Sequence, residues 1–153
     1  MGLFSFIKNA GKKVFGMKEN EAPAEKKAEL KASALLAHVQ ELGLPYKSLK
    51  ISLTADGTVV LAGEVENQAD AEKIVLAVGN VDGVEAVDNN MTVATPEPEA
   101  RYHTAVEGDW LSKIAKTYYD DPMKYDVIFE ANKPMLQDPD EMYPGQVLRI
   151  PNL

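Results

Sequence analysis

The sequence predicts an α+β protein built from two small units that differ in the order of their elements. Apolar residues recur at helical spacing in segments 28–42 and 67–79, and they alternate with polar residues in 49–53. The segment 94–100 contains two prolines two residues apart, which favours an extended spacer. We therefore expect the order αββαβ before this spacer and βααβ after it, with the helices packed on one face of the first sheet.

Local patterns predict the first helix and the hairpin after it. Gly43 and Pro45 end the helix, because glycine is common just after a helix and proline cannot continue one. A strand at 49–53 is followed by the tight-turn dipeptide Asp56-Gly57 and a second strand at 58–64. The apolar face of the helix consists of Ala28, Ala32, Leu35, Leu36, Val39 and Leu42.

A second helix and a third strand complete the first unit. Asn67 stands where a helix N-cap is expected, and Gly79 closes the helix. Segment 84–93 supplies the third strand. The inward face of this helix consists of Ala71, Ile74, Val75 and Val78.

The second unit opens with a strand at 102–106 and closes with a strand at 146–150. Asp109 is expected to cap a helix that reaches about residue 118, and Asp121 with Pro122 starts another. We expect Tyr125, Ile128 and Phe129 to point inward from this last helix. These limits divide the chain into an N-terminal amphipathic segment and loop at 1–23, a first unit at 24–94, a linker at 95–100 and a second unit at 101–153.

Composition excludes several classes of function. The 153 residues include 16 Lys and Arg against 24 Asp and Glu, so the formal net charge is −8. Binding to nucleic acid depends on clustered basic residues, so we expect no nucleic-acid partner. The absence of cysteine excludes disulfides, thiolate metal sites and a cysteine nucleophile, and two histidines disfavour a structural zinc site.

Segment 1–15 is basic and amphipathic. Its apolar stretch at 3–7 is interrupted by Lys8 and is too short for a secretory signal, so we expect a cytoplasmic protein. The apolar residues fall at helical spacing, which fits a helix on a membrane surface or a helix or arm packed on its own protein. We favour the packed segment, and contact of residues 1–15 with a membrane is the alternative.

The sequence contains no recognisable pattern of catalytic residues. Asp120, Asp121, Asp138 and Asp140 read as turn and cap residues, and no base-plus-nucleophile pattern or Gly-rich phosphate loop accompanies them. They also lack the fixed spacing and the glycine of a calcium loop. We therefore expect a protein that is not an enzyme.

Two sets of motifs resemble known domain families. The second unit ends in YPGQVLRIP at 143–151 and has Gly108-Asp109 before Leu111, a pattern that resembles a LysM domain. The first unit is similar to a BON domain in element order and in its spaced valines and glycines at 59–65 and 81–87. Over nearly the whole chain, the combination resembles the bacterial family of cytoplasmic potassium-binding proteins. The resemblance implies a monomeric ion sensor.

The turn after the second helix is the candidate potassium site. A helix C-terminus exposes unpaired carbonyls and partial negative charge, and Gly79 and Gly83 permit sharp turning. By itself this pattern is that of an ordinary helix cap. The resemblance implies that backbone carbonyls hold the ion, with compaction on binding, although Lys8 and Lys12 would repel a cation if they pointed inward. The implied carbonyls belong to Ile7, Ala10, Gly79, Val81, Gly83 and Val84.

Glycan binding, the usual function of LysM domains, is the alternative prediction, as a peptidoglycan-binding or envelope-associated module. The groove that the resemblance implies lies between the turn before the first LysM helix and the loop after the second. In this chain it comprises Gly108, Asp109, Trp110, Asn132 and Lys133. Trp110 could stack on a sugar ring or cover a neighbouring element. A cytoplasmic chain would not meet peptidoglycan, so we favour potassium binding.

Overall fold

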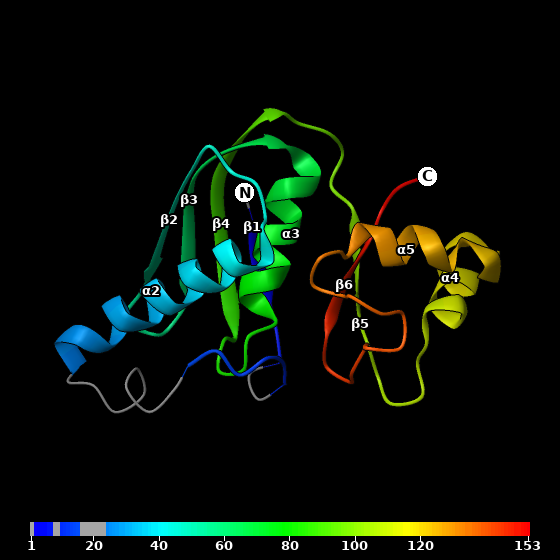
Figure 1. The fold of residues 1–153 in the computed structure, drawn as a ribbon, viewed down its shortest axis with the longest axis horizontal. Coiled ribbons are helices and arrows are strands. Elements are labelled where there is room, and N and C mark those ends of the chain that lie inside the picture. The colour runs from blue at the N-terminus through cyan, green and yellow to red at the C-terminus, as the bar shows by residue number, and fades with distance from the viewer. Residues whose placement is uncertain (1, 8–9, 16–23) are drawn as a thin grey trace.

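A four-stranded sheet with two helices on one face forms the first unit of the computed structural model, which describes residues 2–7, 10–15 and 24–153. Helix α2 packs on β2 and contacts α3, and α3 packs on β3 and β4 (Figure 1). The expected αββαβ order is confirmed, with one strand added before it. The elements are β1 (Gly2–Ser5), α2 (Ala24–Leu42), β2 (Ser48–Leu53), β3 (Val59–Asn67), α3 (Gln68–Gly79) and β4 (Ala86–Thr95).

The sheet has the strand order β1-β4-β3-β2. Strands β2 and β3 form the expected antiparallel hairpin, whereas β3 and β4 are parallel and are connected through α3. The apolar positions that alternate along the strands lie under the helices, and Val59, Leu61 and Val65 are fully buried. Leu35 of α2 and Ile74 of α3 close the core from the other side.

The N-terminal segment forms a strand where helical spacing predicted a helix. Strand β1 pairs antiparallel with β4, from Gly2 opposite Asn89 to Ser5 opposite Ala86. Pairing with an open sheet edge satisfies backbone groups and places Phe6 in the core, which outweighs the helical preference of a short segment. Of the favoured alternatives, a helix or an arm packed on its own protein, the arm is confirmed and the helix is wrong for the described residues.

The second unit has the expected βααβ order around its own small core. A single 3-10 turn, η1, separates the two helices, and Ile128 and Leu148 lie in the core. No helix among the residues that the structure describes is long and apolar enough to cross a membrane. The elements are β5 (Arg101–Thr104), α4 (Leu111–Tyr119), η1 (Pro122–Lys124), α5 (Tyr125–Ala131) and β6 (Val147–Ile150).

Three local predictions about caps had different outcomes. The Asp121 carboxylate accepts a hydrogen bond from the Met123 N–H and caps η1, as expected. Asn67 occupies the N-cap of α3, but its amide donates to the Asp70 carboxylate and caps no backbone N–H. Trp110, not Asp109, is the N-cap of α4, because the Asp109 carboxylate is engaged by His103 Nε2 at 2.8 Å and by the Val106 N–H.

The inward face predicted for α5 was wrong at one position. Ile128 is fully buried and Phe129 is half-buried, but Tyr125 is exposed. Tyr125 is the first residue of a short helix that begins directly after η1, so its side chain lies at the rim of the small core.

The two units are docked along α3. Glu72 of α3 is buried and accepts hydrogen bonds from Arg149 Nε of β6 at 2.6 Å and from the Ala100 N–H at 3.1 Å. Phe4 of β1 stacks edge-on against Tyr102 of β5 with ring centroids 5.3 Å apart. Figure 1 shows β5 and β6 lying beside α3. The buried Ala100 therefore ties the end of the linker to the first unit.

Candidate functional site

The candidate potassium turn follows directly from the end of α3. Gly79 is the last helical residue, and Asn80 is the C-cap, with its N–H bonded to the Leu76 carbonyl at 2.9 Å. Val81 and Val84 are buried, and Gly83 has a φ of +100°, which favours glycine. The side chains of the turn thus anchor it to the core, while its backbone bends away from the helix.

The N-terminal segment lies against this turn. The Lys12 N–H donates to the Asn80 carbonyl at 2.9 Å, and the Asp82 N–H donates to the Lys12 carbonyl at 2.8 Å. On the other side, the Phe6 N–H donates to the Glu85 carbonyl at 2.8 Å. Ile7 and Ala10 lie between these two anchor points along the chain, so the segment that carries them is held beside the turn at both ends.

Two glycines permit this close approach. A Cβ on Gly11 would overlap the Asn80 carbonyl, and a Cβ on Gly79 would overlap the Phe6 ring. Gly11 also has a φ of +111°. The sequence reasoning missed Gly11, although a glycine inside an otherwise periodic apolar segment is a signal that the backbone turns or approaches another chain segment there.

Several of the predicted carbonyls have free acceptor capacity. Among the residues that the structure describes, the carbonyls of Gly79, Gly83 and Val84 accept no hydrogen bond. The Val81 carbonyl accepts from the Val84 N–H at 3.1 Å, and the Ile7 carbonyl accepts from the Ala10 N–H at 3.2 Å. A carbonyl oxygen has two lone pairs, so these two oxygens retain one acceptor position each. The turn can therefore offer neutral oxygens to a cation.

Asp82 is the charged residue within the turn at 79–84, and it is half-buried. The side chain of Lys12 is exposed, and Lys8 lies outside the described residues. Within the described part of the chain, no three His, Asp or Glu side chains gather into a group that could hold a metal ion.

A cavity of about 280 Å³ lies between the turn, α2 and the second unit. Lys12, His38, Asn80, Glu141 and Tyr143 are among the residues that line it. His38 is buried, and its burial, assisted by the Lys12 charge, lowers its pKa, while Glu41 on the same helix opposes this shift. Burial also raises the pKa of Tyr143 to about 12, so its hydroxyl keeps its proton.

His38 is expected to make the folded protein sensitive to acid. Because its pKa is lower in the folded than in the unfolded chain, its contribution to stability is present above the unfolded value of about 6.5 and is lost as the pH falls through the folded value. Urea unfolding between pH 7.5 and 5.5 should give a smaller loss of unfolding free energy for His38→Gln than for the parent, by at most about 1.4 kcal/mol per pH unit. Parallel pH profiles would contradict this assignment.

The residues predicted for glycan binding fall into two separate places. Trp110 is 56% exposed and borders a surface hollow with Tyr125 and Asp140. Gly108 forms the preceding turn with a φ of +90°, and the Asp109 carboxylate is held by His103.

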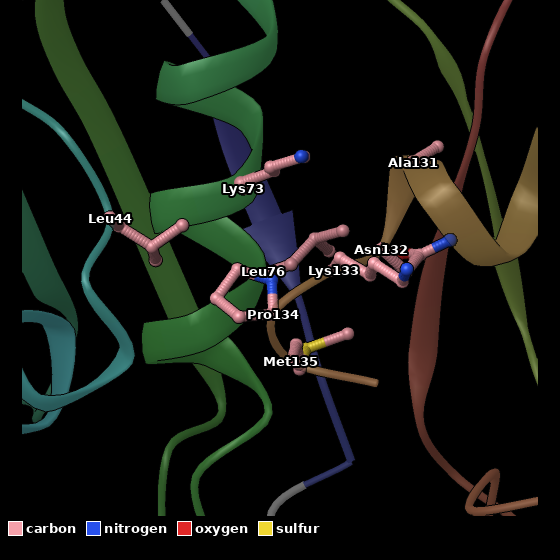
Figure 2. Close-up of a pocket in the computed structure, with 8 residues that line it drawn as sticks. All are labelled: Leu44, Lys73, Leu76, Ala131, Asn132, Lys133, Pro134 and Met135. Carbon is pink, nitrogen blue, oxygen red and sulfur yellow. The ribbon is translucent and has the colours of Figure 1, made fainter. Parts of the chain in front are cut away.

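Asn132 and Lys133 instead line a small pocket against α3. Figure 2 shows residues 131–135 facing Lys73 and Leu76 of the first unit. Asn132 is buried, and its amide bonds to backbone groups of Ile128 and Arg149. Lys133 Nζ pairs with Glu130 at 2.9 Å. The structure therefore does not join this pair and Trp110 in one hollow.

Comparison with known proteins places both units in named families. Residues 28–95 match the BON domain and residues 103–151 match the LysM domain. The chain is 41% identical over 155 residues to the "Potassium binding protein Kbp" of Escherichia coli O6:H1 (strain CFT073), and the match covers 99% of each chain. An uncharacterized protein of Deinococcus radiodurans is 34% identical over 110 residues, which cover 65% of this chain and 43% of that protein.

Proposed function

Because this chain belongs to the family of the potassium-binding protein Kbp, we propose that it binds a potassium ion through backbone carbonyls of its BON domain. It acts as a monomeric, cytoplasmic ion sensor and not as an enzyme. The boundaries proposed for its parts are 1–23, 24–94, 95–100 and 101–153. The observation that carries the proposal is that, within the described part of the chain, no hydrogen bond reaches the carbonyls of Gly79, Gly83 and Val84, while the N-terminal segment is hydrogen-bonded to the same turn. The proposed ligands are the carbonyls of Ile7, Ala10, Gly79, Val81, Gly83 and Val84.

Neutral carbonyl oxygens suit potassium for a physical reason. Rings of such oxygens can replace the hydration shell of this large monovalent ion, whereas magnesium and calcium are bound with the help of carboxylates. The C-terminal end of α3 adds partial negative charge without a full anion. The side chains of Val81 and Val84, which are buried, set the shape of the turn and leave its oxygens as ligands.

Potassium is expected to raise the melting temperature and sodium is not. A ligand that binds only the folded state stabilises it by mass action, by about 2.7 kcal/mol at a hundredfold excess over the dissociation constant. The measurement is thermal unfolding in potassium chloride and sodium chloride at equal ionic strength, with binding followed by calorimetry. Equal shifts of the melting temperature in the two salts would show that the effect is charge screening by salt, and would reject the potassium site.

Asp82→Asn is the control for ligand type. Asp82 lies in the turn, and its N–H bonds to the Lys12 carbonyl, so the substitution changes one charge and keeps the backbone. If carbonyls hold the ion, affinity should stay within roughly tenfold, since Asp82 is half-buried and a nearby charge of this kind contributes about 1 kcal/mol. Complete loss of binding would identify a carboxylate ligand.

Ion binding is also proposed to make the protein more compact. Both the N-terminal segment and the LysM domain contact the turn, so ordering the turn gives the LysM domain a fixed surface to dock on. A ligand can shift such an equilibrium only through different affinities for the docked and undocked states.

Small-angle scattering should therefore give a smaller radius of gyration in potassium than in sodium. Deleting residues 1–15 should weaken both the binding and the compaction, because it removes the Phe6 and Lys12 anchors. Identical scattering profiles in both salts, with saturation by potassium shown by calorimetry, would mean that the ion does not change the arrangement of the two domains and would reject the compaction.

Glycan binding is retained as a second candidate because of one observation, the 56% exposure of Trp110 beside a surface hollow. An exposed tryptophan can stack on a sugar ring. Retention on purified peptidoglycan that is lost in Trp110→Ala would support this function. Membrane contact of residues 1–15 is not proposed, because Phe6 is buried and β1 is paired in the sheet.

A further inference from the structure

Two asparagine side chains complete the outer edge of β6. In its antiparallel pairing with β5, alternate residues of β6 direct their backbone groups away from β5. At Arg149 these groups bond to Asn132, whose Nδ2 donates to the Arg149 carbonyl at 2.9 Å and whose Oδ1 accepts from the Arg149 N–H at 2.7 Å. At Val147 they bond to Asn80 in the same two-point way, at 2.8 Å and 2.9 Å.

The two asparagines come from different domains. Asn132 belongs to the LysM domain itself and follows α5. Asn80 belongs to the BON domain and is the C-cap of α3, inside the proposed potassium turn. The LysM domain by itself can therefore supply hydrogen-bond partners for the backbone N–H and carbonyl of Arg149. The corresponding bonds at Val147 form only when the LysM domain is docked on the BON domain. The Val147 side chain is also buried in the BON core.

The backbone of Asn80 is fixed from both sides. The peptide before it carries the Gly79 carbonyl, which is a proposed ligand. The peptide after it carries the Asn80 carbonyl, which accepts from the Lys12 N–H at 2.9 Å and from the Tyr143 hydroxyl at 3.4 Å. An ion that holds the Gly79 and Val81 carbonyls thus restricts φ and ψ of Asn80, here −81° and 20°, and with them the direction of its side chain.

We propose that Asn80 is the positioning residue that couples potassium occupancy of the turn to docking of the LysM domain. The inference rests on the proposed function, because it takes the turn as the ion site. Asn80 contributes no side-chain ligand. The backbone conformation of the turn sets the position of the Asn80 side-chain amide. Only when the bound ion fixes that conformation can the amide donate to the Val147 carbonyl and accept from the Val147 N–H. By linkage, docking must in return strengthen ion binding by the same factor.

Hydrogen exchange of two amides in one strand tests this coupling in the full chain. The Val147 amide bonds to Asn80 of the BON domain, whereas the Arg149 amide bonds to Asn132 of the LysM domain, so the Arg149 amide reports on the folding of the LysM domain. NMR-detected exchange in potassium chloride and sodium chloride should show Val147 protected about 5- to 150-fold more in potassium, the usual range of coupling, with Arg149 unchanged. Equal protection of Val147 in both salts, with potassium binding shown by calorimetry, would overturn the coupling alone. No binding heat would overturn the proposed function as well.

Asn80→Ala should separate binding from coupling. The variant keeps the backbone carbonyls, so it should still bind potassium, but with an affinity lowered by the coupling factor and without potassium-dependent protection of Val147. Arg149 should remain protected, which shows that the LysM domain is folded. Asn90→Ala, at an exposed position of β4, is the matched control and should behave as the parent does. Potassium-dependent protection of Val147 that survives in Asn80→Ala would overturn the proposal.

Discussion

Replacing Gly11 with alanine is expected to detach the N-terminal segment from the potassium turn and to lower potassium affinity by at least about tenfold. The added Cβ would overlap the Asn80 carbonyl, which is backbone and cannot rotate away, and Gly11 has a φ of +111° that alanine rarely adopts. Overpacking typically costs about 1–3 kcal/mol, and each 1.4 kcal/mol is a tenfold change in affinity. Calorimetric titration and urea unfolding measure the two effects.

Gly57→Ala is the matched control for this substitution. Gly57 also has a positive φ, +89°, but a Cβ there would meet no atom within 4 Å. Its loss of stability should come from backbone strain alone, and potassium affinity should not change. If Gly11→Ala bound potassium as tightly as Gly57→Ala, the N-terminal segment would have no part in the site.

Replacing Arg149 with methionine is expected to destabilise the docked protein by about 3–5 kcal/mol, because it leaves a buried carboxylate without its cation. Glu72 is 2% exposed, and the Arg149 Nε lies 2.6 Å from its Oε1. Among the described residues, the other hydrogen-bond partners of Glu72 include the Ala100 N–H and the Gln68 amide, which carry no charge. Urea unfolding, followed by a probe in each domain, measures the loss.

Two further variants separate this effect from a general loss of charge. Lys116→Met breaks an exposed pair with Asp120 and should cost less than about 1 kcal/mol. Adding Glu72→Gln to Arg149→Met should recover much of the loss, since the uncompensated charge is then removed. A loss for Arg149→Met no larger than that for Lys116→Met would show that the buried pair does not hold the domains together.

The elements that bury one face were predictable from local pattern. The apolar spacing of α2 and α3 and the alternation in β2 and β3 indicate that each element has one buried face. This pattern identifies the helix or strand but does not show which other element covers that face. The N-terminal segment was not predictable in this way. Leu3, Phe4, Phe6 and Ile7 fit a helix in isolation, and the open edge of β4, more than eighty residues later, decides for a strand.

Polar residues show the same division between local and tertiary control. Asp109 and Asp121 both precede helical turns, yet only Asp121 caps, because the Asp109 carboxylate is held by His103. At the candidate site, the local sequence at 79–84 indicated a helix end with glycines. The proposed contribution of Ile7 and Ala10 to the site came from a family resemblance alone.

The sequence by itself determined two units, the order of their elements apart from β1, and a turn after the second helix that can present carbonyls, because these depend on residues close together in the chain. Only the tertiary structure decided that Lys12 pairs with the turn, that Asn80 completes the edge of β6 and that Glu72 holds Arg149. These contacts join residues 67–77 positions apart or connect the first residues to the end of α3. No local periodicity encodes them, since each depends on where two separately formed surfaces meet.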